Sequence, residues 1–315
     1  MTMKLRNKTN QNKILILGGG GIIGREAVYF FLKKKFKVLV IDKNISKLNI
    51  LFKKKNPRLK IYKKNIFSIK KNSKIFDKYY LIINCIGLND HSLGINNPEI
   101  DVKTNIINIL HIIKHFKNKK IIHLGTTHQY SGSMNKIKKF KETFSTDVQG
   151  ISKNAVENYL IFYSNKYNFK LICLRIGNCF GNFQNGILDK KGLIFEILNS
   201  FLKREKFILY KKNIKKNFCY TPDVIAALNF LIYKNLKFPA IYNFIQYNIS
   251  VENFVKKIIQ HIKFGKFIYS KKKIKVNNYD FSRMRRGNFY RIFPNFKYTN
   301  IDTAIKKTLV KIKFK

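Results

Sequence analysis

A run of glycines near the start of the chain has the spacing of a phosphate-binding turn. Four glycines stand in a row from Gly18 to Gly21, directly after the apolar residues 14–17, and Gly24 follows after two intervening residues. Glycine permits positive φ and lets backbone N–H groups approach an anion closely. A helix that begins at this turn presents its N-terminus to the same anion. The spacing therefore indicates a site for the pyrophosphate of a dinucleotide.

Asp42 stands where a second contact to such a ligand is expected. It ends the next predicted strand, 18 residues after Gly24. A carboxylate at that place accepts hydrogen bonds from the adenosine ribose hydroxyls. It would also repel a 2′-phosphate, which favours NAD over NADP, although the neighbouring Lys43 weakens that preference. We expect NAD as the cofactor, and a glycine turn in some other α/β protein is the alternative interpretation.

The elements that would position these residues alternate between strand and helix. Short runs of β-branched and apolar residues, such as 14–17 and 38–41, are typical of buried parallel strands. The expected strands are 13–17, 37–41, 59–62, 80–85, 120–124 and 170–175, and the expected helices are 21–35, 45–54, 99–116 and 150–167. This alternation predicts an α/β fold with a doubly wound, Rossmann-like parallel sheet.

The alternation loosens after about residue 180. We therefore expect a dinucleotide-binding domain over residues 13–180 and a smaller, mixed C-terminal region over residues 181–315. That region would close over the substrate, while segments 218–234 and 242–245 would rejoin the core.

Two later segments are distinctive. Residues 174–181 read Leu-Arg-Ile-Gly-Asn-Cys-Phe-Gly, and residues 216–224 read Lys-Asn-Phe-Cys-Tyr-Thr-Pro-Asp-Val. With the glycine turn, they resemble the NAD-dependent epimerase/dehydratase family, the extended short-chain dehydrogenases that modify nucleotide sugars. The cofactor-binding residues that the glycine turn and this resemblance imply are Gly18, Gly21, Ile22, Ile23, Gly24, Asp42, Asn65, Cys85, Gly87, Asn105 and Lys153.

The resemblance also implies catalytic residues, with one departure. Residues 124–132 look like the family loop Ser-Ser-x-x-Val-Tyr-Gly and place Thr127 at the catalytic Ser/Thr. The family motif Tyr-x-x-x-Lys is replaced by Gln-Gly-Ile-Ser-Lys, which keeps Lys153 and puts Gln149 at the position of the acid/base tyrosine. A primary amide cannot exchange a proton usefully near neutral pH, so Gln149 fails the requirement for general acid–base catalysis.

Three explanations of Gln149 stay open. Another group can transfer the proton, and His128 and Tyr130 are the nearby candidates. For His128 a backbone-bonded loop histidine is the plainer alternative. The enzyme can instead run a step that needs no tyrosine, or the protein can bind NAD and a ligand without turnover.

The substrate side is implied by the same resemblance. Asn178 is expected at the substrate diphosphate, and Arg283 and Arg286 belong to a basic cluster that could clamp it, because guanidinium pairs bidentately with phosphate. A solvated basic stretch is the alternative for that cluster. In the related 4,6-dehydratases the catalytic loop reads Thr-Asp-Glu, whereas the residues aligned here are 127–129, Thr-His-Gln. Dehydration by that mechanism is therefore disfavoured, and epimerisation or simple oxidation and reduction is expected.

The composition is strongly basic, with 64 Lys and Arg against 16 Asp and Glu and a formal net charge of +48. The lysines are spread along the chain, and Asn, Ile, Phe and Tyr are abundant as well. This pattern favours a general drift in amino-acid composition as the cause of the charge, over a specific nucleic-acid partner. Salt-sensitive attraction to polyanions would still follow.

The four cysteines form no C-x-x-C pair, and no metal site is expected. No stretch approaches the length of a membrane span, so we expect a cytoplasmic protein.

These observations combine into one hypothesis and two rivals. We expect an NAD-dependent epimerase or oxidoreductase acting on a nucleotide-activated sugar, in polysaccharide synthesis. Family members often dimerise through two long helices, here near 99–116 and 150–167, so a homodimer is implied. The rivals are a catalytically impaired binding protein of the same fold and a nucleic-acid-binding relative.

Overall fold

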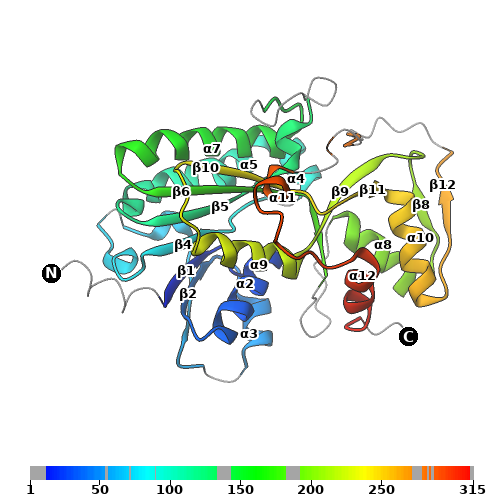
Figure 1. Cartoon of the computed structure of the whole chain (residues 1–315), viewed down its shortest axis with the longest axis horizontal. Helices are drawn as coiled ribbons and strands as arrows, with labels where there is room; N and C mark the ends of the chain where they lie inside the picture. The colour runs from blue at the N-terminus through cyan, green and yellow to red at the C-terminus, as the bar shows by residue number, and fades with distance from the viewer. Residues whose placement is uncertain are drawn as a thin grey trace. The chain divides into compact units, whose positions relative to one another are not determined.

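The structure is a computed structural model. It describes residues 12–53, 56–70, 72–88, 90–132, 143–181, 192–271, 279–281, 284 and 287–312. Its main feature is a seven-stranded sheet in the order β10-β6-β5-β4-β1-β2-β3 (Figure 1). The strands are β1 (Lys13–Leu17), β2 (Lys37–Asp42), β3 (Leu59–Lys63), β4 (Leu81–Asn84), β5 (Lys120–Thr126), β6 (Lys170–Ile176) and β10 (Ala240–Phe244).

The sheet is parallel and buried, as its composition predicts. In the central strand β1, Leu15 pairs with Leu39 of β2 on one side and with Ile82 of β4 on the other. All three side chains belong to one apolar core cluster, which also contains Ile109, Ile112, Val156 and Leu160. A strand covered on both faces needs apolar residues at successive positions, which explains the unbroken run of residues 14–17. The predicted Rossmann-like α/β fold is confirmed.

Helices connect the strands of this sheet. They are α2 (Ile22–Lys33), α3 (Ser46–Leu51), α4 (His91–Asn96), α5 (Pro98–Val102), α6 (Asn108–Ile112), α7 (Val148–Lys166) and α9 (Thr221–Ile232). The single helix expected over residues 99–116 is interrupted: a π-helical stretch (Lys103–Ile107) separates α5 from α6, and a 3-10 turn (Ile113–Phe116) ends it. A π stretch places one more residue in each turn. Apolar periodicity in a short sequence does not reveal that change.

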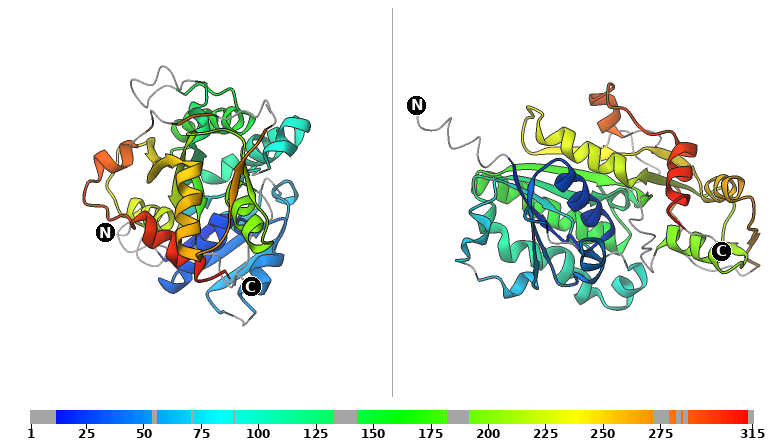
Figure 2. Two further views of the ribbon diagram at one scale, coloured as in Figure 1. Left: turned by 90° about the vertical axis from the view of Figure 1, so that its right-hand side faces the viewer. Right: turned by 90° about the horizontal axis from the view of Figure 1, so that it is seen from below.

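The C-terminal half adds smaller elements. A three-stranded sheet has the order β11-β9-β7, and strands β12 and β8 form a parallel pair. The strands are β7 (Asn178–Phe180), β8 (Phe207–Leu209), β9 (Lys215–Tyr220), β11 (Tyr247–Ser250) and β12 (Phe267–Tyr269), and the helices are α8 (Leu193–Leu202), α10 (Val251–Ile262), α11 (Asn288–Ile292) and α12 (Ile301–Leu309). Helices α10 and α12 lie side by side (Figures 1 and 2), and Lys257 donates to Asp302 between them at 2.9 Å.

The chain divides into two compact units that each combine separate stretches of sequence. The first contains residues 1–125, 151–174 and 228–241, and the second contains 126–150, 175–227 and 242–315. These two units differ from the two regions expected on either side of residue 180, because the chain passes between the units several times. None of the helices in the described part of the chain has the length and apolar character that a bilayer span requires.

Candidate cofactor and substrate residues

The glycine turn joins β1 to α2, and each of its glycines except Gly21 is tightly packed. Gly18 has φ of +74°, and a Cβ there would lie 2.8 Å from the Cys85 carbonyl carbon. A Cβ on Gly24 would lie 2.3 Å from the Gly18 carbonyl oxygen. Around Gly21, by contrast, the nearest atom to such a Cβ is the Gly18 oxygen at 3.5 Å. The turn is thus closed on its inner side and open at Gly21, where α2 begins.

Asp42 is fixed at the carboxyl end of β2, beside this turn. Its Oδ2 accepts from the Gly20 N–H at 2.8 Å, and its Oδ1 accepts from the Asn44 N–H at 2.9 Å. The side chain is half-buried, and an ionised carboxylate has about four acceptor positions, so two backbone donors leave capacity for further hydroxyl donors. The arrangement fits a ribose next to a pyrophosphate. The neighbouring Lys43 is exposed.

Two further predicted cofactor residues occupy the edge of the same unit. Asn65 is exposed and caps a 3-10 turn (Ile66–Ser68), its Oδ1 accepting from the Phe67 N–H at 3.2 Å. Cys85 follows β4, and burial raises the pKa of its thiol to about 12. The thiol therefore stays neutral, and it is not a nucleophile at neutral pH.

Lys153 lies against the segment that follows β4. Its Nζ donates to the Ile86 carbonyl oxygen at 2.9 Å and would be 3.2 Å from a Cβ on Gly87. Burial lowers the pKa of Lys153 to about 8, while the Cys85 and Asp101 groups oppose that shift. The structure thus brings together four residues that the sequence singled out separately: Cys85, Gly87, Asn105 and Lys153.

A buried polar network holds this group in place. Asp101 in α5 accepts from Asn105 Nδ2 at 2.7 Å through one oxygen and from Ser152 Oγ through the other. Asn105, in the π-helical stretch, in turn accepts from the Leu88 N–H at 3.2 Å. Asp101, Asn105 and Ser152 are all buried. One carboxylate therefore ties helix α7, next to Lys153, to the helix that carries Asn105. Sequence reasoning missed Asp101 and Ser152, because nothing local pairs residues so far apart.

We expect Asp101→Ala to lower the free energy of unfolding by about 2–4 kcal/mol, because it leaves two buried donors without their acceptor. Urea unfolding of Asp101→Ala, Ser152→Ala and the double variant measures this. A coupling energy between the two sites of about 1 kcal/mol or more is expected, as for residues in direct contact. Strictly additive effects would contradict the network.

A second buried polar pair, Asn84 and His123, lies in the same unit. No local pattern in the sequence indicates that these two residues are in contact. Asn84 Nδ2 lies 2.8 Å from His123 Nδ1, and Asn84 Oδ1 accepts from the Ile86 N–H at 3.1 Å. Burial and the nearby Lys153 charge hold the pKa of His123 well below its usual value. A neutral imidazole that accepts from Asn84 at Nδ1 carries its proton on Nε2. The pair orients the segment from Asn84 to Gly87.

In the second unit, the loop expected to carry the catalytic threonine forms a 3-10 turn (Thr127–Tyr130). Thr127 is only 1% exposed, whereas Thr126 is half-buried and its Oγ1 accepts from the His128 N–H at 3.2 Å. A residue that bonds a substrate needs accessible surface, so Thr126 is the threonine of this loop that offers it. Tyr130 is fully buried, and its hydroxyl oxygen accepts from Arg175.

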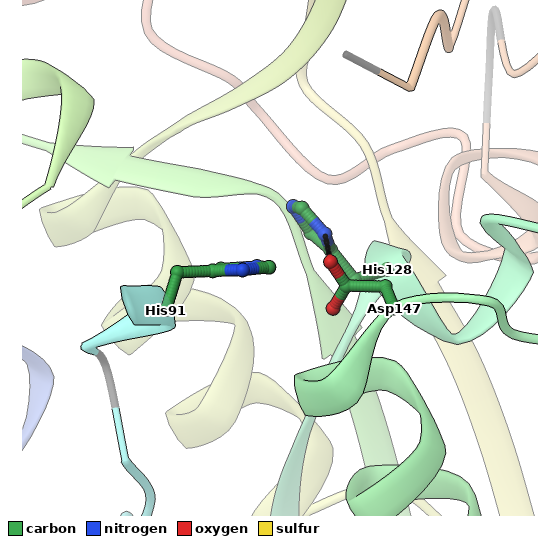
Figure 3. A group of neighbouring side chains, drawn as sticks. All are labelled: His91, His128 and Asp147. Carbon is green, nitrogen blue, oxygen red and sulfur yellow. Dashed lines mark ion pairs between the residues drawn. The ribbon is translucent and has the colours of Figure 1, made fainter. Parts of the chain in front are cut away.

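His128 and Asp147 form an ion pair at the start of α7 (Figure 3). Asp147 Oδ2 lies 3.3 Å from His128 Nδ1, and Asp147 Oδ1 accepts from the Gly150 N–H at 3.1 Å. Asp147 thereby caps the helix whose second residue is Gln149. Gln149 is half-buried. Asp147 is a further residue that sequence reasoning missed.

The substrate candidates are only partly described. Asn178 begins β7, is half-buried and donates from Nδ2 to the Asn217 carbonyl oxygen at 3.2 Å. Arg283 and Arg286 lie outside the described residues. Lys216 is half-buried in β9, and burial lowers its pKa to about 8.

Comparisons with known proteins agree on one family. The model of the NAD dependent epimerase/dehydratase family matches residues 14–244. A dTDP-D-glucose 4,6-dehydratase of Dictyostelium discoideum is 28% identical over 276 residues, which cover 78% of this chain and only 61% of that protein.

Two solved structures share the fold. UDP-glucose 4-epimerase of Thermotoga maritima, with UDP-glucose, matches with a TM-score of 0.74 and 20% identity, over 95% of this chain and 98% of its own. UDP-glucuronic acid 4-epimerase of Bacillus cereus, with UDP-glucuronic acid and NAD, matches with a TM-score of 0.77 and 15% identity, over 95% and 98%. The family match includes the glycine turn, the loop at Thr126 and the start of α7.

Proposed function

Because this chain belongs to the NAD dependent epimerase/dehydratase family, we propose that it binds NAD and oxidises and reduces a nucleotide-activated sugar, with epimerisation as the expected outcome. The observation that carries the proposal is the fixed position of Asp42, whose carboxylate is hydrogen-bonded to Gly20 of the glycine turn. A pyrophosphate-binding turn and a ribose-binding carboxylate in contact are what a dinucleotide requires. The cytoplasmic synthesis of polysaccharide precursors is the setting that this activity suggests.

Each cofactor contact is assigned to a group of the first unit. The N–H groups of Ile22 and Ile23, with Gly21 directly before them, would bind the pyrophosphate at the N-terminus of α2, next to the tight corners made by Gly18 and Gly24. Asp42 would accept from the adenosine ribose, and Asn65 would lie at the adenine. Lys153 would donate to the nicotinamide ribose, supported by Asn105. When bound, NAD supplies a hydride acceptor and donor.

The substrate contacts are assigned to the second unit. Thr127 was the predicted partner of the reacting sugar hydroxyl; because Thr127 is buried and Thr126 is half-buried, we propose the neighbouring Thr126 for that role. Asn178, with Arg283 and Arg286, would bind the nucleotide diphosphate. In the Thermotoga maritima and Bacillus cereus structures the bound substrates are UDP-sugars, and we adopt that class as the first to test.

The test uses purified full-length protein with NAD and a panel of UDP- and dTDP-sugars. We expect NAD to bind by calorimetry, and one sugar to be isomerised by proton NMR or to reduce NAD as followed by NADH absorbance. Bound NAD without any change in any sugar would reject turnover. Absence of NAD binding would reject the whole proposal.

A second candidate function rests on Gln149, whose amide cannot replace the family tyrosine. On this hypothesis the protein binds NAD and a nucleotide sugar without turnover. Gln149→Tyr discriminates the two: a variant that gains activity from a silent wild type supports the binding protein. A wild type that already turns over rejects it.

A homodimer is part of the proposal. Helix α7 carries Ile151, Tyr159 and Phe162 at exposed positions, and Phe162 is 62% exposed. In α5 and the π-helical stretch, Ile100 and Ile107 are also exposed. Exposed apolar residues at helical spacing are typical of a helix that packs against another copy.

We expect Phe162→Glu to shift the protein from dimer to monomer, because a charge would be buried without a partner at the interface. Light scattering after size exclusion measures the mass. Tyr233→Glu, at an aromatic position that is 67% exposed and lies outside these helices, serves as the control for added charge. A wild type that is monomeric at high concentration would contradict the dimer.

A further inference from the structure

We propose that His128, oriented by Asp147, is the acid/base of this enzyme in place of the tyrosine that Gln149 replaces. The inference rests on the proposed redox function and names the residue that moves the proton. It is carried by the position of the ion pair at the first turn of α7.

The imidazole is held beside the position of the missing tyrosine. Asp147 uses one oxygen to cap α7 at Gly150 and presents the other to His128 Nδ1, 3.3 Å away. Because Gly150 directly follows Gln149, the same carboxylate fixes both the histidine and the turn of helix that carries Gln149. Asp147 is 2% exposed, so this carboxylate is shielded from water.

The backbone of His128 is locked to the same turn. A Cβ on Gly150 would lie 2.3 Å from the His128 carbonyl oxygen, so only glycine permits this approach. Ser145 Oγ donates to that carbonyl oxygen at 3.0 Å and accepts from the Asp147 N–H at 3.2 Å. The loop, the cap and the helix start therefore form one rigid assembly within the second unit.

The imidazole is confined but still accessible. The ring of Tyr279 lies edge-on at 6.1 Å and that of Phe281 is tilted at 5.4 Å, measured between ring centroids. The His128 side chain nevertheless retains 17% exposure. A loop histidine with a purely structural role would not need a buried carboxylate at one nitrogen and accessible surface as well.

The chemistry follows from the carboxylate at Nδ1. It favours the tautomer with the proton on Nδ1, which leaves Nε2 as the base and stabilises the imidazolium that forms. With NAD bound as the hydride acceptor, His128 Nε2 would take the sugar hydroxyl proton while the carbon-bound hydrogen is transferred as hydride and the C–O bond becomes C=O. Reduction reverses each transfer, so protons and electrons balance without another reactant.

Lys216 and Tyr279 are titratable neighbours of the pair in the described part of the second unit, and His91 belongs with His128 and Asp147 to a group whose ligand atoms lie within 4.8 Å of one another. Lys216 interacts with both Asp147 and Asp280, and burial lowers the pKa of this lysine to about 8. Tyr279 donates its hydroxyl to the Thr146 carbonyl oxygen at 2.8 Å, so it is held away from proton transfer.

The activity test compares three variants with matched structural effects. His128→Asn removes the base and should lower kcat by roughly 100-fold or more, the usual contribution of general acid–base catalysis. Asp147→Asn keeps a helix cap but loses the charge, and should lower kcat by about 10-fold or more with little change in KM. His261→Asn is the control, because His261 pairs with Asp302 in the same unit at 3.7 Å and should be neutral.

A chemical readout tests the placement of His128 without relying on turnover. Diethyl pyrocarbonate acylates accessible neutral imidazoles, and mass spectrometry locates the product. We expect His128 to be modified in the protein with NAD, and to be protected by the nucleotide sugar, while His261 is modified in both cases. Imidazole added to His128→Ala should restore part of the lost activity.

The outcomes separate the two proposals. An active wild type with an equally active His128→Asn variant, or a His128 that the nucleotide sugar does not protect, overturns the inference alone. A wild type that binds NAD and changes no sugar overturns both. Should His128→Asn not fold, judged by circular dichroism, His128→Gln replaces it in the same comparison.

Discussion

Gly24→Ala is expected to abolish measurable NAD binding and to lower the free energy of unfolding by about 1–3 kcal/mol, the usual cost of forcing an atom into a packed site. The added Cβ would lie 2.3 Å from the Gly18 oxygen and 2.6 Å from Gly19 Cα. Both are backbone atoms, so they can move away only by opening the turn. Calorimetry gives the dissociation constant for NAD, and urea unfolding gives the stability.

Gly21→Ala is the matched control for that variant. Its Cβ would meet nothing closer than 3.5 Å, which is ordinary contact, and its φ is −72°. The stability should therefore stay within about 0.5 kcal/mol of the wild type. If Gly21 faces the pyrophosphate, its affinity for NAD should still fall. A Gly24→Ala protein that binds NAD like the wild type would contradict the proposed site.

Lys153→Met is expected to act on affinity and stability in opposite directions. Loss of a charged donor should weaken NAD binding by roughly 10–100-fold. The same change should raise the free energy of unfolding by about 1–2 kcal/mol near pH 7, because the buried ammonium is less stable in the fold than in the unfolded chain. The shift in the pKa of Lys153 to about 8 supports that sign.

The gain in stability should depend on pH. The folded pKa of Lys153, about 8, lies below the unfolded value of about 10.4, so the unfolded chain binds more protons between these values. The wild type therefore recovers stability as the pH rises through that window, and the advantage of Lys153→Met disappears above it. Urea unfolding at several pH values measures this. Lys166→Met, at an exposed position of the same helix, is the control and should show no such dependence of stability on pH. A Lys153→Met protein that is less stable than the wild type at neutral pH would refute this explanation.

Much of the first unit was predictable because its information is local. Strand β1 (Lys13–Leu17) has the expected bounds, since an unbroken apolar run ends at glycine and a covered parallel strand needs such a run. The turn and the acidic end of β2 were found by spacing alone. Helices α10 and α12 were missed, although their apolar residues lie on one face, because the alternation of strand and helix that guided the assignment had ended by then.

The remaining features arise from packing between distant segments. Asp101 and Ser152 are 51 residues apart, and no pattern in either helix points to the other. Asp147 lies two residues before Gln149 in sequence, but its contact with His128 depends on the tertiary fold. Thr127 was chosen by resemblance, and only the fold shows that Thr127 is buried whereas its neighbour Thr126 is half-buried.

The Asp101 carboxylate also has an evolutionary consequence. It satisfies Ser152 in one helix and Asn105 in another, so a mutation that removes it would strand two polar groups in the core. Replacing all of the partners by apolar residues of similar shape is far less costly than losing one of them. Among homologues of this chain, we therefore expect positions 101 and 152 to change together, with an apolar residue at one accompanied by a small apolar residue at the other.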